Sequence, residues 1–172
     1  MSHDDDLKQK LRDVIHQRRP QRRHTKSGKY YEIETALNND ERLPTIALCC
    51  SEMLNEERGH GIICFVTNQR SAKCLIQMIN ELVCNLNGSI VLMNKNEQIV
   101  YKTCIGNENS VHVFPSKPET LRGTGCQYEM GTVILAHAQQ IDDYVYHSIV
   151  EPSLERTGIN VVSINTATSG KD

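Results

Sequence analysis

The sequence predicts an α/β fold with a mainly parallel central sheet and helices on both faces. Three short apolar runs carry this prediction: residues 62–67 (IICFVT), 132–138 (TVILAHA) and 160–166 (NVVSINT). Each run is short and rich in apolar, β-forming residues, which is typical of a strand buried on both faces. Because segments with helical spacing alternate with the runs, we expect the three runs to be adjacent, parallel strands.

The N-terminal part is expected to be a short helix followed by a basic arm. The helical pattern is set by four apolar residues: Leu7, Leu11, Val14 and Ile15. Residues 18–29 (RRPQRRHTKSGK) then hold six Lys or Arg and no acid. Pro20, Ser27 and Gly28 indicate a loop or an arm in this stretch. We therefore divide the chain into residues 1–34, a helix and a partly disordered arm, and residues 35–172, the folded domain.

Two helices are expected around the first buried run. Apolar residues recur at helical spacing from Leu43 to Leu54, and Asn38, Asn39 and Asp40 ahead of them form an N-cap cluster. The next helix begins near Ser71, after the 62–67 run. Its apolar residues follow the i, i+3, i+4, i+7 pattern and are Leu75, Met78, Ile79, Leu82, Val83 and Leu86.

Residues 89–116 are expected to leave the parallel pattern. Three short strands, SIVLMN, QIVYKT and SVHVFPS, are separated by turns rich in Asn, Lys, Glu and Gly. They predict an antiparallel excursion before the chain returns to the sheet. Residues 142–155 are then expected to form a helix, although Pro152 weakens its end.

Composition sets modest bounds on function. The chain has 172 residues, enough for one sizeable core, and its net charge of −2 argues neither for nor against nucleic acid. Trp is absent and Phe occurs twice, which argues against a base-stacking platform. No signal-peptide pattern and no apolar run of membrane-spanning length is present, so we expect neither secretion nor a membrane partner. The seven cysteines are odd in number and form no C-x-x-C pair, which favours free thiols in a reducing compartment and no metal site.

Phosphate chemistry needs a Gly-rich loop between a strand and a helix, and this chain lacks one at the expected place. The segment before the 43–54 helix is ETALNNDERLP, which holds neither Gly nor Lys. The similar letters of HTKSGK (24–29) lie too far upstream. Such chemistry also needs an acidic strand end to hold Mg²⁺ and position water. The 132–138 run ends instead in His137 and Ala138, and we interpret His137 as a core residue rather than a metal ligand or a proton shuttle.

Three further residues are candidates for contact with a nucleotide. Arg122 stands in the turn LRGTG (121–125), where an Arg can neutralise phosphate, or can simply be a loop residue. Thr166 and Thr168 belong to NTATSGK (165–171) at the end of the last run. Their hydroxyls can relay the state of a phosphate to neighbouring elements, or can serve only as turn residues.

The basic arm has three alternative roles. It can contact DNA phosphates, act as a nuclear-localisation signal, or be no more than a solvated run of charge. The DNA-binding candidates are Arg18, Arg19, Arg22, Arg23, Lys26 and Lys29.

Taken in order, the segments from 43 to 170 resemble the ATPase domain of the viral DNA-packaging terminase large subunit of herpesviruses and tailed phages. LPTIALCC is similar to the helix after the phosphate loop, and GIICFVTNQRSAKCLIQMINELV to the second strand and long helix. SVHVFPS with LRGTG resembles the strand and Arg-Gly turn before the acidic motif. VILAHAQQID takes the place of the strand that ends in Asp-Glu, and VVSINTATSG resembles the coupling strand and turn. The resemblance implies a P-loop-ATPase-like, three-layer fold.

The departures from the family pattern decide the expected activity. The Gly-Lys-Ser/Thr motif has no counterpart near Asn38 and Asn39, and the Asp-Glu pair is replaced by His137 and Ala138. The resemblance therefore implies a degenerate ATPase domain, with ATP and Mg²⁺ as cofactors only if a site is functional. Its partners would be other packaging-motor subunits, in an oligomer, or double-stranded DNA, in the host nucleus or cytoplasm. Two alternatives stay open: an active ATPase whose site another subunit completes, and a non-enzymatic nucleic-acid-binding or scaffolding module.

Overall fold

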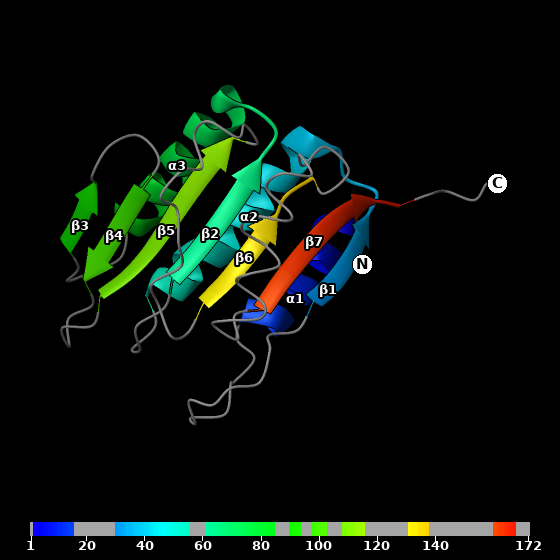
Figure 1. Cartoon of the computed structure of the whole chain (residues 1–172), viewed down its shortest axis with the longest axis horizontal. Coiled ribbons are helices and arrows are strands. Elements are labelled where there is room, and N and C mark those ends of the chain that lie inside the picture. The colour runs from blue at the N-terminus through cyan, green and yellow to red at the C-terminus, as the bar shows by residue number, and fades with distance from the viewer. Residues whose placement is uncertain are drawn as a thin grey trace.

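A seven-stranded sheet forms the centre of the molecule (Figure 1). The computed structural model describes residues 2–15, 30–55, 61–84, 90–93, 98–102, 108–115, 131–137 and 160–167. The strands are β1 (Tyr30–Thr35), β2 (Gly61–Val66), β3 (Ile90–Met93), β4 (Gln98–Lys102), β5 (Glu108–Pro115), β6 (Gly131–Leu135) and β7 (Asn160–Thr166). The helices are α1 (His3–Ile15), α2 (Asn39–Leu54) and α3 (Gln69–Cys84). The strand order is β1-β7-β6-β2-β5-β4-β3.

The prediction for the three apolar runs is confirmed. They form β2, β6 and β7, which are neighbours in the sheet and parallel to one another, with Ile62 opposite Thr132 and Val133 opposite Val161. Their described side chains are buried except at the end of β7. The helix predicted around 71–86 is α3, which packs on β2 and β5. The helix predicted at 142–155 lies outside the described residues.

The antiparallel excursion is present but is shorter than expected. Only β3 and β4 run fully antiparallel to their neighbours. Strand β5 is antiparallel to β4 on one side but parallel to β2 on the other, with Val111 opposite Ile62. It therefore belongs to the five-stranded parallel part, β1-β7-β6-β2-β5, and joins it to the excursion.

All three described helices cover the same face of the sheet (Figure 1). Side chains alternate between the two faces of a strand, so Ile62, Cys64 and Val66 of β2 meet the helices. They share one hydrophobic core with the buried faces of α1, α2 and α3. Ile63 and Phe65 point to the opposite face and are also buried. The sheet is therefore covered on both faces along β2.

The N-terminal residues take part in this core. The predicted apolar positions of α1 are all buried, and Leu7 and Leu11 are fully enclosed. An ion pair between Arg12 and Glu52 also joins α1 to α2. Strand β1, which was not expected from the sequence, follows as the edge strand beside β7. The division drawn after residue 34 thus falls inside a strand of the sheet.

Candidate functional site

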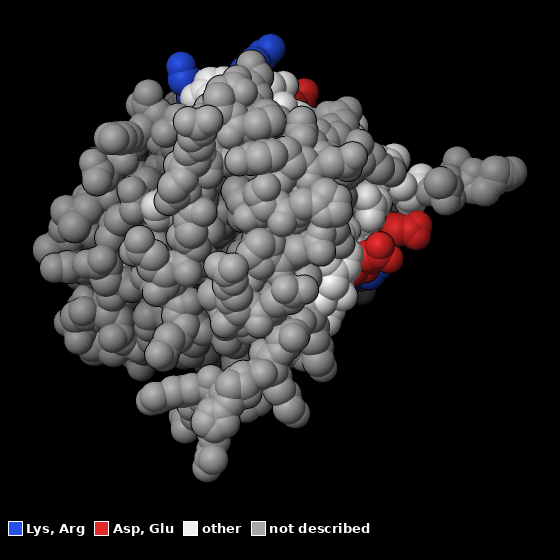
Figure 2. Space-filling model, viewed as in Figure 1, with Lys and Arg blue, Asp and Glu red and all other residues white. Residues whose placement is uncertain are grey.

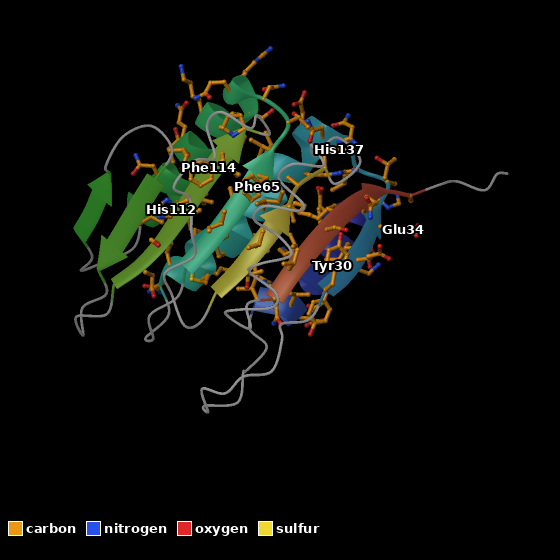
Figure 3. The ribbon with its side chains drawn as sticks, in the orientation of Figure 1. Tyr30, Glu34, Phe65, His112, Phe114 and His137 are labelled. Carbon is orange, nitrogen blue, oxygen red and sulfur yellow. The ribbon has the colours of Figure 1, made fainter. Side chains whose placement is uncertain are left out.

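The parallel strands all end at one edge of the sheet, which we call the carboxyl edge. In open α/β sheets this is where ligands bind. Among the described residues the carboxyl edge consists of the residues that follow four strands, 36–38, 67–68, 136–137 and 167, together with Thr166 at the end of β7. In Figure 3 the label of His137 marks this edge, where β6 ends.

The turn between β1 and α2 is short, and reciprocal hydrogen bonds join its last residue to the first turn of the helix. Only Ala36, Leu37 and Asn38 separate the strand from the helix. The Asn38 side chain accepts a hydrogen bond from the backbone N–H of Glu41, at 2.9 Å. The Glu41 carboxylate accepts one in return from the backbone N–H of Asn38, also at 2.9 Å. This capping box engages the backbone N–H groups of Asn38 and Glu41, and it confirms the predicted N-cap cluster, with Asn38 as the cap.

The first turns of the two central helices are also held in place. The Asn39 amide donates a hydrogen bond to the Thr67 hydroxyl at 2.7 Å, which links the start of α2 to the end of β2. Asn68 caps α3, because its side-chain oxygen accepts the backbone N–H of Ser71 at 2.8 Å. At the start of each helix one backbone N–H, that of Glu41 in α2 and that of Ser71 in α3, is therefore bound by the side chain of the capping residue.

Arg42 occupies the centre of the carboxyl edge. It extends from the first turns of α2, and its side chain is fully buried. Its Nε donates to the backbone oxygen of Leu37 at 3.0 Å, and its Nη1 donates to those of Ala136 at 2.9 Å and Ile164 at 3.4 Å. Its Nη2 donates to the Thr166 hydroxyl at 2.9 Å. One guanidinium thus joins the β1–α2 turn to the ends of β6 and β7.

The charge of Arg42 has no carboxylate partner among the described residues. Its ligands are three carbonyl oxygens and a hydroxyl, all of which are neutral acceptors. Burial lowers the pKa of the guanidinium from its ordinary value. Removing a cation from water is unfavourable unless hydrogen bonds replace its hydration, and here four bonds do so. The carboxyl edge therefore holds a buried cation whose hydrogen bonds, among the described residues, go to protein oxygens.

His137 lies beside this network, on the turn after β6. It is half-buried, and its Nδ1 atom is enclosed without a hydrogen-bond partner among the described residues. Burial lowers the pKa of its imidazole, and the positive charge of Arg42 lowers it further. The ring is therefore held in its neutral form at neutral pH. Its half-exposed place on the turn after β6 sets it apart from the fully buried residues of the strand itself.

The structure describes only part of the predicted site. Thr166 lies at the carboxyl edge, where it accepts the hydrogen bond from Arg42, and His137 lies nearby. The other predicted positions lie outside the described residues: Arg122, Ala138, Thr168, Arg18, Arg19, Arg22, Arg23, Lys26 and Lys29. The sequence analysis did not single out Arg42. A single Arg between two acids and a Leu gives no periodic signal, and its role depends on strand ends far away in the sequence.

Other kinds of site receive no support from the described part of the chain. It contains no cluster of three His, Cys, Asp or Glu suited to a metal ion. Cys49, Cys50 and Cys64 are free and buried, and burial raises the pKa of both Cys49 and Cys64 to about 12. Such thiols are not activated nucleophiles. No helix in the described ranges is long and apolar enough to span a membrane.

Comparison with known proteins relates the fold to that of phage large terminases. No protein-family model matches the chain, and no curated protein matches it. Among solved structures, a mutant of the large terminase ATPase domain of Thermus phage P74-26 is similar with a TM-score of 0.57 and 11% identity. The large terminase of the thermophilic bacteriophage D6E, in complex with ADP, is similar with a TM-score of 0.54 and 10% identity.

The likeness extends over most of this chain but over less of the phage proteins. It covers 82% of this chain and 60% of the P74-26 domain, and 92% of this chain and 38% of the D6E protein. The chain therefore spans less than two thirds of the length of these neighbours. At such low identity the likeness shows the fold alone, which is the α/β fold of a terminase ATPase domain.

Proposed function

We propose that this chain is a packaging-motor domain of the terminase type that does not hydrolyse ATP and acts through contacts with other motor subunits or with double-stranded DNA. The observation that carries the proposal is that polar groups at the carboxyl edge, above all those of Asn38, Glu41 and Arg42, are hydrogen-bonded to other groups of the protein. A neighbour with the same fold, the D6E large terminase, holds ADP. In this chain the start of α2 is capped by Asn38 and Glu41, and Arg42 is bound by protein oxygens.

Electrostatics at the start of α2 also support the absence of nucleotide binding. Asp40 and Glu41 lie in the first turn of the helix, where their charges interact favourably with the helix dipole. The same charges repel a phosphate. A phosphate-binding loop needs Gly residues for close backbone approach and a Lys for charge, and residues 36–38 contain neither.

The end of β6 supports the absence of hydrolysis. Residues 131–137 contain no carboxylate. Mg²⁺ prefers oxygen ligands, so a neutral imidazole at His137 is a poor substitute for an acid. Phosphoryl transfer relies on charge neutralisation and on water positioning, and the elements that supply them in the terminase family have no counterpart here.

Contact with DNA is assigned to the basic arm, residues 18–29. Binding to a duplex of arbitrary sequence should be weak and should fall steeply with salt, because counterions are released from each neutralised phosphate. With six Lys or Arg in the arm, the slope of log K against log salt concentration should reach about −5. Fluorescence anisotropy of a labelled duplex over a salt series measures this slope.

A quadruple variant tests the assignment. Changing Arg18, Arg19, Arg22 and Arg23 to Ala should flatten the slope by about three to four units. The matched control removes four cations from α1 and α3: Lys8, Lys10, Arg70 and Lys73. That control should change the slope far less. An unchanged slope in the arm variant contradicts the DNA contact, and loss of nuclear accumulation in the same variant would identify the arm as a localisation signal instead.

A further inference from the structure

The outer edge of β1 presents backbone groups that no other described strand pairs with. Strand β1 ends the sheet and pairs only with β7. Ala167 donates its backbone N–H to the Thr35 oxygen at 2.8 Å, so the backbone of Thr35 faces β7. The backbone N–H and C=O groups of successive residues point to opposite sides of a strand. Those of Ile33 therefore also point toward β7, whereas those of Glu32 and Glu34 point away from it. Among the described residues no hydrogen bond reaches these outward groups of Glu32 and Glu34.

The side chains of the same residues form an acidic row beside this edge. Tyr30, Glu32 and Glu34 lie on the face opposite the helices and are exposed, whereas Ile33 and Thr35 are buried. Figure 3 labels Tyr30 and Glu34 on β1, and Figure 2 shows acidic side chains gathered at this rim of the molecule. Neither Glu32 nor Glu34 has an ion-pair partner among the described residues.

Natural edge strands usually carry features that prevent a further strand from pairing with them. In β1 the features present oppose some partner strands and favour others. Lys, Pro and bulges are the common devices, and the sequence YYEIET contains neither Lys nor Pro and pairs with β7 in unbroken register. Its Tyr, Ile and Thr residues favour the strand conformation. The two glutamates oppose pairing with a second copy of β1, because like charges would face each other across the pair. They favour a strand of the opposite charge.

We propose that the outer edge of β1 accepts an extended segment of a partner protein with Lys or Arg at alternate positions, as an added strand. The backbone groups of Glu32 and Glu34 would bond to the segment, and their carboxylates would pair with its cations. Main-chain bonding provides the affinity and the charges provide the selection. The site lies on a different surface from the carboxyl edge, so it does not depend on the proposed function.

A peptide pair tests this site on the full chain. The probe is a capped synthetic peptide of alternating Lys and Val, and its control is a capped peptide of alternating Glu and Val. Only the Lys peptide should bind, as measured by isothermal titration calorimetry at low salt. Hydrogen exchange followed by NMR should show fast exchange at Glu32 and Glu34 in the free protein, and at least about tenfold slower exchange with the peptide. Ile33, which faces β7, should exchange slowly in both states.

Two sets of variants separate charge from main-chain bonding. Changing both Glu32→Lys and Glu34→Lys should weaken binding of the Lys peptide by about tenfold or more and create binding of the Glu peptide. Glu34→Pro removes an outward N–H without removing a bond to β7, and should weaken binding more than Glu34→Gln, which removes only the charge. Thermal melts followed by circular dichroism check folding. If Glu34→Pro unfolds the chain, the variant with both Glu32→Lys and Glu34→Lys still tests whether the peptide binds at this edge.

Three outcomes would overturn the proposal. The first is slow exchange at Glu32 and Glu34 in the free protein, because the edge would already be covered by the chain itself. The second is a concentration-dependent dimer in analytical ultracentrifugation that the charge reversal abolishes, because the occupant would then be a second copy. The third is equal binding of the Lys peptide to the wild type and to the charge-reversed variant.

Discussion

At the scale of single residues, Arg42 connects three segments that are distant in the sequence. Its guanidinium binds the carbonyl oxygens of Leu37, Ala136 and Ile164 and the hydroxyl of Thr166. Hydrogen bonds to a charged group contribute more than neutral ones, and a buried carbonyl left without its donor is costly. The guanidinium is thus bound by protein oxygens at the place where the ends of β6 and β7 meet the turn after β1.

Substitution of Arg42 should destabilise the whole domain. Arg42→Met keeps much of the side-chain volume but leaves three buried carbonyl oxygens without this donor, so we expect the free energy of unfolding to fall by about 3 kcal/mol. Urea denaturation measures the change. Arg70→Met, at an exposed position of α3, is the matched control and should change stability by less than about 0.5 kcal/mol. A change in Arg42→Met as small as in this control would mean that Arg42 does not hold the edge together.

At the scale of elements, the buried strands could be predicted from the sequence, whereas the edge strand β1 could not. Strands β2, β6 and β7 are buried on both faces along most of their length, so their sequences contain short runs of apolar β-forming residues that give a clear signal. The sequence of β1, YYEIET, has exposed polar residues at alternate positions and directly follows the basic arm, so it lacks that signal. The Asn38 cap was visible because capping is local, whereas the contacts of Arg42 depend on strands that meet only in the folded chain.

Helix α1 should behave as part of the folded domain. Leu11 is fully buried in the core shared by α1 and the sheet. Leu11→Ala should lower the free energy of unfolding by about 2–5 kcal/mol, because it removes buried apolar contacts and leaves a cavity. Lys10→Ala on the exposed face of the same helix is the control. Chemical denaturation should give one cooperative transition in both variants. A loss below about 1 kcal/mol for Leu11→Ala, close to that of a surface change, would show that α1 is dispensable to the core.

At the scale of the whole molecule, a terminase-type fold is combined with a carboxyl edge that the protein fills with its own side chains. The capping box, the Asn39–Thr67 bond and the Arg42 network join side chains and backbone groups of this edge to one another. The sequence could predict which residues stand at the turn after β1 and at the end of β6, but not the hydrogen bonds that Arg42 makes there. These features support the proposed function, in which the domain acts through contacts rather than through ATP hydrolysis.

Steady-state ATP turnover tests this account most directly. Phosphate release from ATP with Mg²⁺ should be indistinguishable from the rate without protein, because the chain lacks charge neutralisation at the turn after β1 and an acid at the end of β6. The His137→Ala variant should give the same result. Turnover at an ordinary enzymatic rate, about 1 s⁻¹ or faster, that persists through repurification and is abolished by His137→Ala would contradict the account. It would show that the carboxyl edge is an active site.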